Sequence, residues 1–125
     1  MTTNAPLKFT QALENPHYQG VQDVHPEELS QHLGQVLLVD VRQPEEYVGE
    51  LGHIEGADLV VLDTLPQNLP QLPQDKTIVF ICRSGSRSAH AAAFAQSQGW
   101  NNVYNMLGGM MLWNNLKYPV VRTSK

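Results

Sequence analysis

The chain has 125 residues, of which 42% are hydrophobic and 16% are charged, a composition typical of one soluble domain. A domain of this length buries enough apolar surface to fold without metal ions or disulfides. Its formal net charge of -4 argues against nucleic acid as the main partner.

The sequence carries no signal for a membrane, for export or for a metal. No apolar run approaches the ~20 residues of a membrane-spanning helix, and the amino terminus lacks the basic and then apolar layout of an export signal. We therefore expect a cytoplasmic protein that binds no membrane. The single cysteine, Cys82, excludes an internal disulfide and a multi-cysteine zinc site, and the five histidines lack zinc-ligand spacing. We expect no metal and no cofactor.

The chain divides into a polar extension over residues 1–20, one folded domain over 21–122 and a short tail over 123–125. Within the domain, short apolar runs alternate with helical patterns, which indicates an α/β sheet. In chain order, we expect a strand at 21–24, a helix at 26–33, a strand at 36–39, a helix at 44–48, a strand at 58–62, an irregular connection at 64–75, a strand at 77–81, a helix at 88–98, a strand at 103–106 and a helix at 110–116.

Two of these strands are predicted to be central. Residues 36–39 and 77–81 are continuous β-rich runs without polar alternation, as in parallel strands that are covered on both faces. The helix at 88–98 is rich in alanine, which allows a close approach to a sheet, and it ends before Gly99.

Cys82 follows the second of these strands directly, and a short loop then leads into the alanine-rich helix. In open α/β sheets, ligands bind beyond the carboxyl ends of the strands, so Cys82 stands where such folds place active sites. The helix amino terminus, the backbone amides of the turn around Gly85 and the guanidinium groups of Arg83 and Arg87 all favour a thiolate there. The same groups suit a small oxyanion.

A purely structural interpretation competes with this one. Free cysteines are often inert core residues, and Arg83 and Arg87 would then be solvated surface charges. Two cations at a helix amino terminus, however, oppose the helix dipole, and such a conflict is typical of functional sites. The pattern therefore favours a reactive cysteine.

Four motifs, in this order along the chain, resemble signatures of the rhodanese family of sulfurtransferases. The active-site loop of that family is similar to Cys82-Arg83-Ser84-Gly85-Ser86-Arg87-Ser88. The other three are Val39-Asp40-Val41-Arg42 with Glu45-Glu46-Tyr47, then Gly52-His53-Ile54-Glu55-Gly56-Ala57, and finally Gly108-Gly109 with Trp113. Together the four motifs span essentially the whole predicted domain.

The resemblance implies a three-layer α/β domain with a central, mainly parallel five-stranded sheet flanked by helices. It also implies a sulfur transfer in which Cys82 takes a sulfane sulfur from thiosulfate or a similar anionic donor. The resulting persulfide passes it to cyanide in vitro, and to a thiol or a protein acceptor in the cell. By this analogy Cys82 is the nucleophile, and Asp40, Arg42 and His53 support the site. The donor would be bound by the loop residues Arg83, Ser84, Gly85, Ser86, Arg87 and Ser88.

Two other functions remain open at this stage. A phosphatase or arsenate reductase on the same fold also uses a loop cysteine and arginine, but the phosphatase spacing would place the arginine where Ser88 stands. A persulfide carrier or recruitment module would act with a partner protein, and the Met106, Met110, Met111 and Trp113 cluster could offer it a docking surface. A methionine and aromatic stripe at helical spacing is, however, more often core.

Overall fold

The computed structural model describes residues 7–123 of the chain. Residues 1–6 of the predicted extension and 124–125 of the predicted tail lie outside this range. Among the described residues, no helix is long and apolar enough to cross a membrane.

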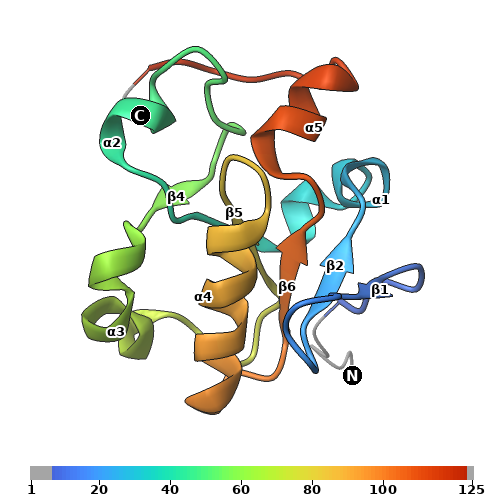
Figure 1. Ribbon diagram of the computed structural model, residues 1–125, viewed down its shortest axis with the longest axis vertical. Coiled ribbons are helices and arrows are strands. Elements are labelled where there is room, and N and C mark those ends of the chain that lie inside the picture. The colour runs from blue at the N-terminus through green and yellow to red at the C-terminus, as the bar shows by residue number, and fades with distance from the viewer. Residues whose placement is uncertain (1–6, 124–125) are drawn as a thin grey trace, which may run out of the picture.

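The core of the molecule is a six-stranded sheet with the strand order β1-β2-β6-β5-β3-β4 (Figure 1). Every neighbouring pair is parallel except β1 and β2, which are antiparallel. The mainly parallel α/β sheet is confirmed, but it has one strand more than expected, because the extension adds β1 at the edge. Two exposed residues make that strand, too few to leave an alternating pattern. The strands are β1 (Leu13–Glu14), β2 (Gln22–Val24), β3 (Leu37–Asp40), β4 (Asp58–Leu59), β5 (Ile78–Ile81) and β6 (Val103–Met106).

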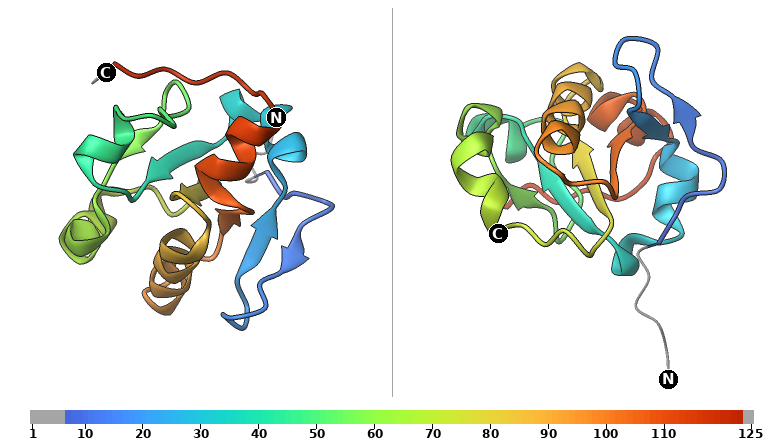
Figure 2. Two further views of the ribbon diagram at one scale, coloured as in Figure 1. Left: turned by 45° about the horizontal axis from the view of Figure 1, so that its top comes forward. Right: turned by 90° about the horizontal axis from the view of Figure 1, so that it is seen from below.

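Helices cover both faces of this sheet and give the predicted three layers. In Figure 1, α4 crosses in front of β5 and β6, and Figure 2 shows α1 and α5 on the opposite face from α3 and α4. The predicted helix at 26–33 is shorter than expected, because α1 ends at Ser30 and a separate 3₁₀ turn, η1 (Leu33–Gln35), follows it. The helices are α1 (Pro26–Ser30), α2 (Pro44–Tyr47), α3 (Leu65–Asn68), α4 (Ser86–Ser97) and α5 (Gly109–Asn115).

The two helix layers bury alternate side chains of the central strand β5. Ile78 and Phe80 belong to the apolar cluster on the α3 and α4 face. Val79 and Ile81 belong to the cluster on the α1 and α5 face, which contains Trp113. All four residues of β5 are at most 1% exposed, so the predicted central strand is covered on both sides.

The irregular connection expected at 64–75 is wrong in part. It contains α3 and a 3₁₀ turn, η3 (Leu69–Gln71), on the sheet face that α4 also covers. Leu65 and Leu69 lie four residues apart and are 1% and 2% exposed, so one side of this short helical stretch is core. Three prolines obscured the pattern, but two of them stand in the first turns of these helices, where proline is tolerated.

A turn of two glycines after β6 brings the start of α5 against the loop that follows β5. Gly108 and Gly109 have φ angles of 72° and 60°, in the left-handed region that glycine adopts readily. The N–H of Met110 donates to the carbonyl of Cys82 at 2.8 Å, and the N–H of Met111 donates to that of Arg83 at 2.9 Å. A Cβ atom on Gly109 would lie only 2.6 Å from the Cys82 carbonyl oxygen. The absence of a side chain therefore permits this contact.

Gly109→Ala is expected to displace the Cys82 loop and to lower stability by several kcal/mol. Gly56→Ala is the matched control, because Gly56 also has a positive φ, 90°, but no atom lies within 4 Å of its Cβ position. That control should cost only the backbone strain, about 1–2 kcal/mol. Urea unfolding of both variants checks the difference. Equal losses would mean that the close approach of Gly109 to the loop is unimportant.

Candidate active site

Cys82 lies at the carboxyl end of β5, at the start of a four-residue connection to α4. Gly85 ends this connection in a left-handed conformation, φ 104°, and serves as the N-cap of α4. The helix begins at Ser86, two residues earlier than predicted. Ser86 and Arg87 therefore belong to its first turn, where backbone N–H groups have no partner within the helix.

The Cys82 sulfur is buried and receives polar contacts from its own loop. The residue is 1% exposed, which suits a small substrate better than a bulky one. The Gly85 N–H donates to Sγ at 3.0 Å, and the Ser88 hydroxyl oxygen lies 3.2 Å from Sγ. A backbone donor aimed at sulfur stabilises the negatively charged thiolate more than the neutral thiol.

Other N–H groups of the loop are available to a ligand. Those of Ser84, Ser86 and Arg87 have no acceptor among residues 7–123. They stand at the positive end of the α4 dipole, an arrangement that binds anions. The loop can therefore hold an anionic group beside Cys82.

Arg87 is turned toward α2 and forms a two-fold contact with Glu46. Its Nη1 lies 2.8 Å from Glu46 Oε1 and its Nη2 lies 2.9 Å from Oε2. The hydrogen bond to Arg87 is the main cause that lowers the pKa of Glu46 from 4.5 to about 2. Glu46 belongs to the second of the four sequence motifs but is not among the predicted site residues, and the structure shows that it fixes the orientation of Arg87.

Arg83 has a different environment, although it lies in the same loop. Its residue is exposed, and no described side chain forms a hydrogen bond or ion pair with its guanidinium. It borders a shallow pocket of about 260 Å³ that Arg42 and three glutamates also line. Arg83 is thus free to meet a ligand from solvent.

Asp40 and Arg42 form a buried ion pair at the end of β3. Arg42 Nη2 lies 2.7 Å from Asp40 Oδ2, and the two residues are 0% and 1% exposed. Arg42 also donates to the carbonyls of Glu46, at 3.2 Å, and Gly52, at 2.7 Å. The pair thereby joins β3, α2 and the segment before His53, and it reaches Arg87 through Glu46.

His53 is fully buried against α2. Its ring stacks on Tyr47 with a centroid separation of 3.5 Å, and its Nδ1 lies 2.7 Å from the Tyr47 carbonyl. Its Nε2 has no hydrogen-bond partner within the part of the chain that the structure describes. The hydrogen bonds and ring contacts of His53 among the described residues place it beside α2, and none of them joins it to the Cys82 loop.

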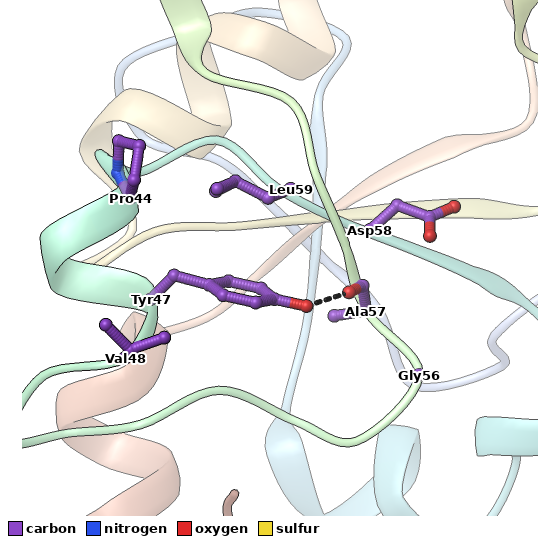
Figure 3. A pocket seen from close by; sticks show the side chains of 7 residues that line it. All are labelled: Pro44, Tyr47, Val48, Gly56, Ala57, Asp58 and Leu59. Carbon is purple, nitrogen blue, oxygen red and sulfur yellow. Dashed lines mark hydrogen bonds between the residues drawn. The ribbon is translucent and has the colours of Figure 1, made fainter. Parts of the chain in front are cut away.

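Tyr47 also walls a pocket of about 500 Å³ between α2 and β4, shown in Figure 3. Its hydroxyl donates to the Ala57 carbonyl, and burial is the main cause that raises its pKa. No residue from Cys82 to Ser88 lines this pocket. The cavity is therefore separate from the loop that holds the cysteine.

Asn105 and Asp23, two polar residues of the sheet that are not among the predicted site residues, lie behind the loop. The Ser88 hydroxyl donates to Asn105 Oδ1, and Asn105 Nδ2 donates to Asp23 Oδ1 at 2.9 Å. Both residues are buried, at 2% and 4% exposure. The only signal in the sequence was a polar residue within each of two short strands.

Comparison with known proteins agrees with this architecture. A family model for the rhodanese-like domain matches residues 25–116. A protein named sulfurtransferase from Allochromatium vinosum is 36% identical over 81% of this chain and 95% of its own length. Thiosulfate sulfurtransferase GlpE of Pseudomonas paraeruginosa is 34% identical over 66% of this chain and 72% of its own. The crystal structure of a rhodanese-related protein from Thermoplasma volcanium superposes with a TM-score of 0.75 at 29% identity, covering 81% and 98% of the two chains. This chain belongs to the rhodanese-like domain family.

Proposed function

We propose that the protein is a sulfurtransferase that moves a sulfane sulfur from thiosulfate, or a similar anion, to a thiophilic acceptor. The observation that carries the proposal is the Cys82 sulfur held by the Gly85 N–H, at 3.0 Å, at the amino-terminal end of α4. The names of the relatives from A. vinosum and P. paraeruginosa support the same activity.

The loop supplies what the first step of the reaction requires. The Cys82 thiolate attacks the outer sulfur of thiosulfate, and the bond between the two donor sulfurs breaks. Sulfite leaves with the electron pair of that bond, and Cys82 becomes a persulfide. The N–H groups of Ser84, Ser86 and Arg87 are positioned to bind the anionic donor before this step and the negative terminal sulfur after it.

The second step returns the cysteine to its starting state. Cyanide or an acceptor thiolate attacks the terminal sulfur of the persulfide, and the bond to Cys82 Sγ breaks. Its electron pair returns to Sγ, so the thiolate is the leaving group. The same loop donors that favour the thiolate therefore assist both nucleophilic attack and release.

The geometry of Arg87 favours sulfur transfer over phosphoryl transfer. Both terminal nitrogens of Arg87 are bound by Glu46, so its guanidinium is committed to α2. A phosphatase-type arginine has to offer such a fork to the phosphoryl oxygens. The short loop and the paired arginine both suit a single sulfur atom better than a phosphoryl group.

A persulfide carrier that hands its sulfur to a protein partner is the second candidate. The cluster Met106, Met110 and Trp113 does not supply its docking surface, because all three residues are fully buried. Of the four residues considered for that surface, only Met111 is exposed, at 43%. This cluster therefore gives the carrier no docking surface apart from Met111.

Cys82→Ser is expected to abolish sulfur transfer while the protein remains folded. After incubation with thiosulfate, intact-mass analysis should show one added sulfur on the wild-type protein and none on the variant. Cyanide-dependent thiocyanate formation should be lost in parallel. Substantial thiocyanate formation by Cys82→Ser would refute the role of Cys82 as nucleophile, and a stable persulfide without turnover would favour the carrier.

Arg83→Ala and Arg87→Ala are expected to differ in steady-state kinetics with thiosulfate. Arg83 is exposed and has no ion-pair partner among the described residues, so its loss should mainly raise KM, with an effect that shrinks as salt screens its charge. Arg87 braces the loop through Glu46, so its loss should also lower kcat by about tenfold or more. Measurements at two ionic strengths separate the two results. The same KM change with an unaltered kcat in both variants would make Arg87 only another steering charge.

The Glu46 pKa predicts how acid affects this brace. Because the pKa falls from 4.5 to about 2 on folding, the Arg87 contact stabilises the protein fully above about pH 4.5. That contribution is lost as pH falls toward 2. Glu46→Gln should therefore lose less stability than the wild type between pH 5 and about pH 2, with Glu45→Gln, an exposed neighbour, as the control. Parallel curves for the wild type and Glu46→Gln in thermal unfolding would contradict the assignment.

A further inference from the structure

A buried chain of polar side chains connects Cys82 to β2, the strand next to the edge of the sheet. Ser88 Oγ lies 3.2 Å from Cys82 Sγ and donates to Asn105 Oδ1, and Asn105 Nδ2 donates to Asp23 Oδ1 at 2.9 Å. Asp23 and Asn105 are direct register partners on β2 and β6. Ser88, Asn105 and Asp23 are 0%, 2% and 4% exposed, and Asn105 and Asp23 also line a pocket of about 450 Å³ beside Ser84, Gly85 and Ser86. We call Ser88, Asn105 and Asp23 the polar relay.

The contacts of Asn15 and Asp23, at the end of the polar relay far from Cys82, determine which group donates and which accepts in each of its hydrogen bonds. Asn15, in the turn between β1 and β2, accepts at Oδ1 from the N–H groups of His17 and Tyr18, at 2.8 and 2.9 Å. Its Nδ2 therefore faces Asp23, at 3.0 Å. An Asp23 carboxylate can only accept, so Asn105 must direct Nδ2 toward it and Oδ1 toward Ser88.

Ser88 has one hydroxyl hydrogen and two neighbours that can accept it. While it donates to Asn105, only its oxygen lone pairs face Cys82 Sγ, which suits a thiol S–H and not a thiolate. To donate to a thiolate, Ser88 must release Asn105 Oδ1. A buried acceptor is then left without a partner, which is costly.

We propose that Asp23 and Asn105 are positioning residues that hold the Ser88 hydrogen away from Cys82 and so reduce the fraction of Cys82 present as thiolate. The polar relay acts against the Gly85 N–H, which favours the thiolate. The proposal rests on the proposed role of Cys82 as the nucleophile, because the polar relay would set how much of that nucleophile is ionised. It concerns ionisation of the thiol, so it can be measured without a sulfur donor.

The charged groups around Cys82 act separately from the polar relay. Arg87, from α4, interacts electrostatically with Cys82 and is paired with Glu46 of α2. Arg83 is exposed in the loop, and Asp40 is paired with Arg42 beside β3. None of these groups is hydrogen-bonded to Ser88, Asn105 or Asp23 among the contacts of the described residues.

Asn105→Leu tests the acceptor directly, because it removes Oδ1 and releases the Ser88 hydrogen to the sulfur. The ultraviolet absorbance of the thiolate measures its fraction, and the chain has only one cysteine to report. At a pH where about one-tenth of the wild-type thiol is ionised, the fraction should rise roughly three- to fivefold, the scale of one hydrogen bond. Cys82→Ser provides the blank.

Two further variants keep the test decisive. Asp23→Asn replaces the obligate acceptor with an amide that can also donate, so Asn105 is free to turn, and the thiolate fraction should rise in the same direction. Loss of the Asp23 charge also favours the thiolate, so the rise must be larger in the wild-type background than in Ser88→Ala to support the polar relay. Asp23→Asn replaces Asn105→Leu as the test if circular dichroism shows that Asn105→Leu is unfolded. Val103→Ala, a buried change on the same strand outside the polar relay, should weaken β6 and leave the thiolate fraction unaltered.

The Ser88→Ala variant shows whether the change in the thiolate fraction depends on the Ser88 hydroxyl. In Ser88→Ala there is no hydroxyl hydrogen to hold, so adding Asn105→Leu should leave the thiolate fraction as it is in Ser88→Ala alone. An unchanged fraction in folded Asn105→Leu, or an equal rise with and without Ser88, would overturn the proposal. Loss of sulfur transfer with this ionisation pattern intact would instead count against the proposed function.

Discussion

The reversal of the chain between Ile81 and Ser86 is the constraint on which the site depends. The four residues Cys82–Gly85 connect the buried strand β5 to the helix α4, which packs back on the sheet. In this tight connection, carbonyl groups and N–H groups point in different directions. The carbonyls of Cys82 and Arg83 point toward α5 and accept from the N–H groups of Met110 and Met111, so α5 closes that side. The N–H groups of Gly85 and the first turn of α4 then serve the sulfur and its ligand. One backbone reversal thus explains both the packing of α5 and the chemistry of the loop.

This reversal brings two arginines, Arg83 and Arg87, to the amino terminus of α4, and a carboxylate pairs with one of them. Two arginines near the amino terminus of α4 oppose the helix dipole. Arg87 is balanced by Glu46, whose carbonyl is in turn held by Arg42. Arg83 remains solvated and available. This arrangement explains how the Asp40–Arg42 pair can support the site without touching the sulfur, because it positions α2 and with it the partner of Arg87.

Local patterns in the sequence predicted the parts of the fold that depend on neighbouring residues. The strand at 77–81 differs from its predicted bounds by one residue, because a continuous apolar run is typical of a covered parallel strand. The strand at 103–106 has the predicted bounds although Asn105 interrupts its apolar run. The helical turns around Leu65 were missed, since prolines suggested a loop. Glu46 and Arg87 are 41 residues apart, and Asn105 and Asp23 are 82 apart, so only the folded sheet brings these pairs together. No local periodicity encodes such contacts.

The polar relay extends beyond the residues that the family model matches. The family model begins at residue 25, whereas Asp23 precedes it and Asn15 lies ten residues before its start. The loop, Ser88 and Asn105 lie within the shared domain, so the terminal anchor of the polar relay comes from the segment outside it. Among residues 7–123, Asp23 accepts only from side-chain amides and has no cation as a partner. Such a buried carboxylate adds little to stability, because apolar residues of similar shape can pack as well. Its physical effect is directional: an acceptor-only group at Asp23 decides where the hydrogen of Ser88 lies. The amino-terminal segment can therefore change the fraction of Cys82 present as thiolate without any change in the Cys82–Ser88 loop.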